Sequence, residues 1–382
     1  MSKKFLITLK PIDKFFFGGD MTFTISNKKE EQANERFSSY IIRSSYFPQQ
    51  TSLLGMLRFL LLSNSDFFAD GKIKDEAKDD VINLIGPKSF VVSSENGTFG
   101  QIEELGACFL IDKNSEDNVW YSFAPFDYDP SSPEEKKSES EVSDTNTIKL
   151  LGSGVNGKEF TLPKLNWYKA KEGYKPRLLG SNNKYISISD IFVEDRRIGI
   201  ARDIKSGKTD NSGLFKQISY RFKNYNDDKD NGFKKIADWH FAFYVTVADD
   251  CKIETYSGNI VSVGGDNSQF EFRCEKCEDK RIPTVCEDVK KVVLQSPTYI
   301  KRGDLKEVTF FMSQVIPFRF MQTKVATTTD YTLKAGYQRS CKYELYAPGS
   351  VFYFKKEEDA KKFKKALKSY QAFRQIGYNE FK

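Results

Sequence analysis

The segment FPQQTSLLGMLRFLLL, residues 47–62, decides how the first part of the chain folds. Its proline holds the preceding phenylalanine in an extended conformation, and Thr51 or Ser52 can cap a helix that occupies the rest of the segment. The run KFLITLK at residues 4–10 is typical of a strand. The sequence therefore predicts a strand followed by a helix, and the free amide groups at the helix N-terminus can donate hydrogen bonds to a phosphate.

Beyond this segment, strand patterns outnumber helix patterns. RRIGIARD at residues 196–203 and LFKQISY at residues 214–220 flank a tip that contains glycine and lysine, and together they predict a β-hairpin. HFAFYVTV at residues 240–247 predicts a buried strand, and residues 292–300 predict another. Residues 357–370 predict a charged helix with one apolar face.

The order strand, helix, strands occurs in each half of the chain. It favours an α+β fold of two ferredoxin-like (RRM-like) domains with insertions. We place the first domain at residues 1–286 and the second at residues 287–382. The stretch at residues 127–146 is rich in Ser, Glu, Pro and Lys, so we expect a mobile loop inserted in the first domain.

Composition and charge narrow the class of protein. The 382 residues are 39% apolar and 29% charged, which is typical of a soluble globular protein. The net charge of +6 permits an RNA partner but does not require one. The longest apolar run, residues 56–62, contains Arg58 and is too short to span a bilayer, and the N-terminus does not resemble a signal peptide. We therefore expect a cytoplasmic protein without membrane contacts.

The six cysteines do not suggest a disulfide scaffold in a chain of this length. Cys274 and Cys277 are separated by two residues, and Cys286 follows them. A structural zinc site needs four ligands, and Cys251 is the available fourth. Because one such pair is common by chance, free reduced cysteines are the favoured interpretation, and we expect no metal or other cofactor.

The residue set expected of an RNA-cleaving enzyme is missing. Metal-independent RNA cleavage most often uses histidine as acid or base, and the chain has one histidine, His240, within an apolar strand pattern. Paired carboxylates typical of two-metal nucleases are not apparent. The sequence thus predicts no catalytic residue, although a site built on lysine or tyrosine stays open.

Three segments could bind RNA through cations, amides or aromatic rings. The first is the hairpin with Arg197, Arg202, Lys205 and Lys208, for which a solvated tip is the favoured interpretation from the residues alone. The second is the turn from Gln49 to Ser52, for which helix capping is equally plausible. The third is the C-terminal segment RQIGYN at residues 374–379, for which a plain edge strand is the alternative.

Several blocks spread along the chain carry a family resemblance. They are PID (11–13), FFFGGD (15–20), FPQQTSLLGMLR (47–58), RIGI (197–200), GLF (213–215), GGD (264–266), LQSPT (294–298), APGSVFYF (347–354) and IGYN (376–379). In this order they resemble the RAMP protein of type III-B (Cmr) CRISPR complexes that sits beside the large polymerase-like subunit. The chain departs from that family in its first turn, where Gly18 and Gly19 replace the usual basic residue.

The resemblance implies a non-catalytic subunit of a type III-B CRISPR effector complex that acts in antiviral defence. Its expected partners are the 5′ repeat-derived tag of the crRNA, the large polymerase-like Cmr subunit and a neighbouring backbone RAMP subunit. The alternative is a RAMP-family endoribonuclease that processes CRISPR precursor RNA, which the single histidine disfavours. The expected RNA-binding residues are Gln49, Gln50, Thr51, Ser52, Arg58, Arg197, Arg202, Lys205, Lys208, Arg374, Tyr378 and Asn379.

Overall fold

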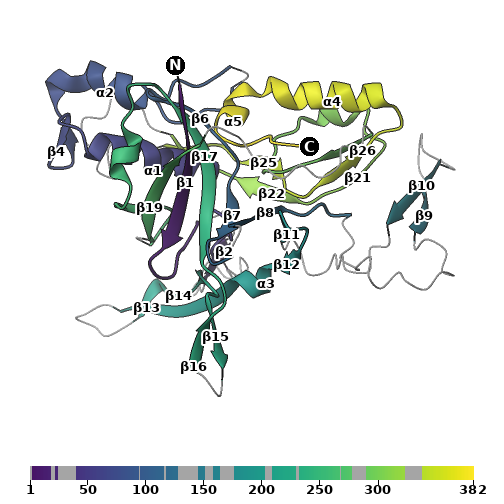
Figure 1. Cartoon of the computed structure of the whole chain (residues 1–382), viewed down its shortest axis with the longest axis horizontal. Helices are drawn as coiled ribbons and strands as arrows, with labels where there is room; N and C mark the ends of the chain where they lie inside the picture. Colours follow the sequence, from purple (N-terminus) through teal and green to yellow (C-terminus); the bar gives the residue numbers. More distant parts are fainter. Residues whose placement is uncertain are drawn as a thin grey trace, which may run out of the picture.

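The protein has a strand-rich α+β fold, which confirms the predicted class in its coarse form (Figure 1). The computed structural model describes residues 2–18, 22–24, 40–93, 95–115, 118–127, 145–150, 158–163, 176–202, 209–228, 232–266, 268–277, 290–322 and 338–382. The two ferredoxin-like domains and the boundary between residues 286 and 287 stay predictions. Within the described ranges, no helix is long and apolar enough to cross a membrane.

The largest sheet runs in the order β12-β11-β8-β7-β17-β1-β19-β18, and β6 also pairs with β17. Strand β1 lies between β17 and β19 and is antiparallel to both. Alternate residues of β1, including Ile7 and Leu9, point into the main hydrophobic cluster. The strands are β1 (Lys3–Pro11), β6 (Ile102–Leu105), β7 (Phe109–Asp112), β8 (Val119–Phe123), β11 (Arg177–Gly180), β12 (Tyr185–Ser187), β17 (Trp239–Val247), β18 (Ile260–Ser262) and β19 (Gln269–Lys276).

Helix α1 (Gln50–Ser63) packs against this sheet and confirms the predicted helix. Its leucines at 53, 57 and 61 are buried in the main cluster. Gln49 occupies the N-cap position without a side-chain cap, so Thr51 and Ser52 lie inside the first turn and the expected capping is wrong. Further elements here are β4 (Phe68–Ala69), β5 (Lys72–Ile73), η1 (Asp75–Ala77), α2 (Lys78–Ile85) and η3 (Ile253–Tyr256).

A long hairpin, β13 (Phe192–Arg202) with β14 (Thr209–Phe222), confirms the predicted one. It extends away from the large sheet at the bottom of Figure 1. Strand β3 (Tyr40–Arg43) runs parallel to β14 and leads into α1, and β2 (Thr22–Thr24) pairs with β3. The tip at residues 203–208, with Lys205 and Lys208, lies outside the described residues. Nearby elements are α3 (Ile188–Ile191), β15 (Tyr225–Asp228) and β16 (Gly232–Lys235).

Residues 290–382 form smaller sheets covered by α4 (Glu357–Ser369), as Figure 1 shows. The sheet β20-β26-β21 stands beside the pair β22-β25, with helix α5 (Gln371–Gln375) after α4. The predicted strand at 292–300 is too long, because β20 ends at Val293. The elements are β20 (Lys291–Val293), η4 (Arg302–Leu305), β21 (Phe310–Met312), β22 (Val315–Phe318), β23 (Met321–Gln322), β24 (Gln338–Arg339), β25 (Tyr343–Tyr346) and β26 (Val351–Tyr353).

The stretch predicted as a mobile loop is described only at its ends. Asp127 is buried, and its carboxylate pairs with Lys291 at 2.6 Å and accepts a hydrogen bond from the Tyr353 hydroxyl. Residues 145–146 belong to β9 (Thr145–Leu150), which pairs with β10 (Lys158–Pro163). Residues 128–144 lie outside the described residues.

Candidate nucleic-acid interface

A groove of about 470 Å³ opens at the N-terminal end of α1, and we call it the α1 groove. One wall is the segment from Arg43 to Gln50 that joins β3 to α1. The other wall comes from the C-terminal part of the chain, mainly residues 314–318 around β22 with Pro297 and Tyr378. The groove therefore depends on contacts between segments that are far apart in the sequence.

Aromatic rings line the first wall of the groove. The Tyr46 ring stacks on Tyr220, with 4.6 Å between ring centroids and 26° between ring planes. Phe47 packs against Phe123 at 4.7 Å. Tyr220 is buried, and burial raises the pKa of its hydroxyl above the ordinary range, so the phenol stays neutral. The partly exposed rings of Tyr46 and Phe47, held by this packing, can stack on a flat partner.

Polar groups stand beside these rings. Arg43 is the charged residue among the described groove-lining residues; its guanidinium lies 3.3 Å from the Glu194 carboxylate and its side chain is 43% exposed. Gln49 and Gln314 add amide groups to the lining. Sequence reasoning missed Arg43 and Tyr46. The mixed polar and aromatic run RSSYF at residues 43–47, directly before the helix, is the signal that could have found them.

Gln50 lines the same groove but its amide is committed to the backbone. The buried Nε2 donates to the carbonyls of Gly106 at 2.7 Å and Ile376 at 2.9 Å. Gly377 follows with φ of +84°, and a Cβ at that position would lie 1.9 Å from Gln50 Nε2. Gln50 thus ties the start of α1 to the C-terminal segment, and this contact shapes one end of the groove.

The C-terminal segment is mainly an internal anchor. Asn379 is fully buried; its Oδ1 accepts from the Tyr299 amide at 2.8 Å and its Nδ2 donates to the Tyr299 carbonyl at 3.2 Å. Tyr378 is buried against the groove, and burial raises the pKa of its hydroxyl. Arg374 is half-buried in α5. The segment is not a plain edge strand, and its tyrosine is the member that lines the groove.

Arg58 lies in the interior on α1. It is 7% exposed, and its guanidinium donates from Nε to the Ile85 carbonyl at 2.7 Å and from Nη2 to the Gly86 carbonyl at 3.3 Å. These carbonyls end α2, where backbone acceptors lack helical partners. Arg58 therefore caps α2, and we do not retain it as a proposed RNA contact.

Arg197 lies apart from the α1 groove. It is exposed on β13 opposite Gln217 and lines a separate polar cavity of about 260 Å³ together with Lys14 and Asp266. Arg202 ends the same strand opposite Thr209. The structure thus brings Gln49, Gln50 and Tyr378 to one groove, with Thr51 and Ser52 in the adjoining helical turn, and leaves Arg197 elsewhere.

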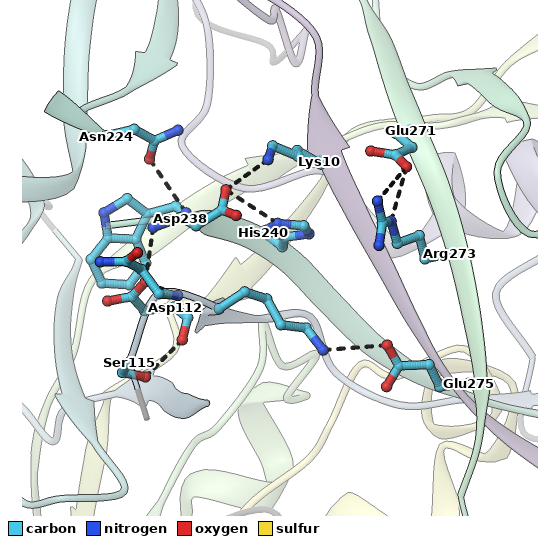
Figure 2. Close-up of polar contacts among 12 residues, drawn as sticks. Lys10, Asp112, Ser115, Asn224, Asp238, His240, Glu271, Arg273 and Glu275 are labelled. Atoms are coloured by element: carbon cyan, nitrogen blue, oxygen red, sulfur yellow. Dashed lines mark hydrogen bonds and ion pairs between the residues drawn. The ribbon is translucent and has the colours of Figure 1, made fainter. Parts of the chain in front are cut away.

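His240 belongs to a polar cluster on the large sheet (Figure 2). Its Nε2 lies 3.4 Å from the Asp238 carboxylate, which also pairs with Lys10 at 2.8 Å. The side chain is 4% exposed, and burial, aided by Lys10 and Lys113, outweighs Asp238 and lowers its pKa to about 4. The imidazole is therefore neutral near pH 7 and poorly suited to act as a general acid there.

Among the described cysteines considered for zinc, Cys277 lies apart from Cys274. Cys274 packs against the main hydrophobic cluster, whereas Cys277 packs against a cluster on the other face of the sheet that contains Tyr244. Alternation along a strand explains this, because residues three apart point to opposite faces. Cys251 is buried and Cys286 lies outside the described residues. Among the described residues, no group of three or more His, Cys, Asp or Glu could hold a metal.

Comparison with known proteins gives one family match and several structural likenesses. The model of a family described as CRISPR-associated protein (Cas_Cmr3) matches residues 7–381. A comparison with curated proteins gives no match. A chain of the type III-B Cmr-beta complex bound to cognate target RNA and AMPPnP is 12% identical with a TM-score of 0.49, covering 98% of this chain and 95% of that one.

Two further structures are similar at lower scores. A chain of Cmr-beta bound to cognate target RNA is 14% identical with a TM-score of 0.47, covering 99% of this chain and 96% of that one. A chain of the Csm3-Csm4 subcomplex of the type III-A interference complex is 9% identical with a TM-score of 0.35, covering 91% and 92%. With TM-scores below 0.5, these three likenesses carry no part of the assignment, which rests on the family match.

Proposed function

This chain belongs to the Cas_Cmr3 family of CRISPR-associated proteins, and from that premise we propose that it is a non-catalytic subunit of a type III-B Cmr complex whose α1 groove binds the 5′ repeat-derived tag of the crRNA. The α1 groove is the observation that carries this proposal. It joins the stacked rings of Tyr46 and Tyr220 with the Arg43 guanidinium and the Gln49 amide in one cavity.

Such a lining matches single-stranded RNA. Proteins recognise unpaired RNA by stacking splayed bases on aromatic rings and by hydrogen bonds to base edges. A mainly apolar groove with a few convergent polar groups also fits a flat, partly polar ligand better than it fits a bare phosphate. We propose that bases of the tag enter the groove while Arg43 faces the backbone.

The hairpin remains a second proposed contact with the guide RNA. Arg197 is exposed on β13, and Arg202, Lys205 and Lys208 follow it in the sequence. We also propose that the large polymerase-like Cmr subunit and a neighbouring RAMP subunit dock on this chain.

The alternative, an endoribonuclease that processes CRISPR precursor RNA, finds less support. It would need an acid and base poised near neutral pH, and the buried His240 has a pKa of about 4. Incubating the purified protein with repeat RNA, with and without Mg²⁺, tests this point. Defined cleavage products would favour the alternative.

The groove is tested with a labelled RNA of the tag sequence and the purified chain. Tyr46→Ala removes a stacking ring, which is worth about 1–3 kcal/mol per base, so we expect tag affinity to fall about 5–150-fold. Tyr46→Phe should restore it. The control is Tyr225→Ala, which removes a ring that is 56% exposed on the distant β15. Equal losses in both alanine variants, or no loss in either, would place the tag elsewhere.

A variant that removes one charge tests the groove independently of base stacking. Arg43 and Arg196 both pair with Glu194, at 3.3 and 2.8 Å. Arg43 lines the groove and Arg196 does not. Arg43→Gln should lower the slope of log affinity against log salt by about 0.7, as expected for one lost phosphate contact on a single strand. Arg196→Gln should leave the slope of a tag-only RNA unchanged.

A further inference from the structure

The positive charge of the chain is concentrated in its C-terminal part. Residues 290–382 contain 19 Lys and Arg against eight Asp and Glu, a net charge of +11. The preceding 289 residues contain 40 Lys and Arg against 45 Asp and Glu, a net charge of −5. Such an asymmetry between two parts of a chain indicates a polyanionic partner for the basic part.

Helix α4 carries a large share of this charge in an ordered pattern. Lys361, Lys364, Lys365 and Lys368 are related by spacings of three and four residues, so they lie along one side of the helix. We call these four residues the α4 lysine stripe. Like charges at these spacings destabilise a helix, so the stripe works against the stability of the isolated protein. A bound polyanion would remove that repulsion.

Most of the stripe has no acidic partner. Lys361 pairs with Glu357 at 2.7 Å, at the N-terminal end of the stripe. Within the described part of the chain, no carboxylate lies at ion-pair distance from Lys364, Lys365 or Lys368. Lys368 stands over the Phe381 ring, with 6.0 Å between Nζ and the ring centroid. The acidic residues of α4 are confined to its first turn, so all charged residues in the rest of the helix are lysines.

The underside of α4 fixes the stripe in place. Ala360, Phe363 and Leu367 are buried in one hydrophobic cluster, and the Phe363 ring lies 5.1 Å from Phe352 of β26. The helix therefore cannot rotate, and its lysines stay on the outer surface. Figure 1 shows α4 along the top of the molecule, whereas the β13–β14 hairpin extends at the bottom.

The basic surface continues onto η4. Leu305 of η4 packs against the cluster beneath α4. Lys301, next to η4, stands over the Tyr370 ring at 5.3 Å, and Arg302 is exposed. Lys301 thus lies at the C-terminal end of α4, where the helix dipole also favours positive charge, and the Asp304 carboxylate of η4 accepts a hydrogen bond from the Tyr370 hydroxyl there. Stripe and η4 together form an elongated, mainly basic surface, which suits an extended polyanion.

We propose that the α4 lysine stripe binds the phosphate backbone of an RNA strand without regard to sequence, as a second RNA surface separate from the α1 groove. A lysine ammonium acts as a point charge on a phosphate, whereas the planar arginine guanidinium is better suited to bidentate contacts. The regular spacing of the stripe matches a repeating anion better than it matches the irregular charges of an acidic protein. This proposal does not depend on tag binding in the groove.

The test uses a single-stranded RNA without the tag sequence and the purified full-length chain. The variant Lys364→Gln/Lys365→Gln/Lys368→Gln keeps good helix formers and removes three charges. Each lost phosphate contact should lower the slope of log affinity against log salt by about 0.7, so we expect the three substitutions together to lower it by about 2. The fold-loss of tag affinity caused by Tyr46→Ala should be the same with and without the three stripe substitutions, because separate surfaces contribute additively, and this separates the stripe from the groove.

The matched control is Lys72→Gln/Lys74→Gln/Lys78→Gln, which makes the same charge change around β5 and α2. A fall of the same size in this control would mean that net charge alone governs binding, and it would overturn the proposal. An unchanged slope in the stripe variant would overturn it too. So would a stripe variant that binds RNA normally but no longer assembles with other Cmr subunits, because the stripe would then be a protein contact.

Discussion

At the scale of single residues, several polar side chains that looked free in the sequence are used inside the protein. Gln50, Arg58 and Asn379 are each less than a tenth exposed, and each holds backbone carbonyl or amide groups of a distant segment. An unsatisfied buried backbone group costs about 1–3 kcal/mol, so a buried polar side chain that satisfies such a group stabilises the fold. Only Gln50 of the three also lines the α1 groove.

His240 gives a prediction about acid stability. Because burial lowers its folded pKa to about 4, below the 6.5 of an exposed histidine, the unfolded chain binds a proton first as pH falls. Its contribution to stability is thus complete above pH 6.5 and is lost as pH falls toward 4. Between pH 7 and pH 4, we expect the unfolding free energy of the unchanged protein to fall by up to about 3 kcal/mol more than that of His240→Gln. Denaturant titrations at both pH values measure this, and equal acid losses in both proteins would contradict it.

At the scale of elements, local sequence patterns predicted those helices and strands whose formation depends mainly on neighbouring residues. The apolar face of α4 and the apolar run of β17, which is buried on both faces, could be predicted without information from distant segments. The ends of elements were less predictable. Residues 292–300 were predicted to form one strand, but β20 stops at Val293. The residues that follow form single bridges with other segments, Leu294 with Phe381 and Thr298 with Tyr346. The partners of such bridges are not visible in a short window of sequence.

The joint between α1 and α2 gives a prediction at this scale. Arg58→Met keeps the length and helix propensity of the side chain but removes both donors to the α2 carbonyls. We expect a loss of about 2–3 kcal/mol in unfolding free energy, since buried acceptors lose charged donors. Tag affinity of the folded variant should not change. The control is Lys78→Met, which breaks an ion pair of 3.3 Å on the surface and should stay within about 0.5 kcal/mol.

At the scale of the whole molecule, the predicted membership in the Cmr RAMP proteins is confirmed by the family match over residues 7–381. The candidate site was predictable in part. The Gln49–Ser52 turn and Tyr378 do lie together, but the wall from β22 and the ring of Tyr46 were missed. Residues 43–50 and 314–318 meet only through the tertiary fold, and a single sequence without such contacts gives no reason to pair them.

Gly377 is where this long-range joint can be tested. Its φ of +84° disfavours any side chain, and a Cβ would lie 1.9 Å from Gln50 Nε2 and 2.4 Å from the Gly106 carbonyl. Gly377→Ala must therefore push apart the start of α1, the Gly106 turn and the C-terminal segment. We expect unfolding free energy to fall by about 2–4 kcal/mol, from backbone strain and steric overlap together.

The same variant links the joint to function, because Gln50 and Tyr378 both line the α1 groove. Gly377→Ala should weaken binding of the tag RNA at temperatures where the chain is still folded, while binding of a tag-free RNA to the α4 lysine stripe stays unchanged. Gly303→Ala is the control, since a Cβ at Gly303 meets no atom within 4 Å and its effect should be small. If Gly377→Ala destabilised the protein yet left tag affinity intact, the groove would not be the tag site. A shift of Gln50 and Tyr378 changes the lining of the groove and should therefore change the affinity of any RNA bound there.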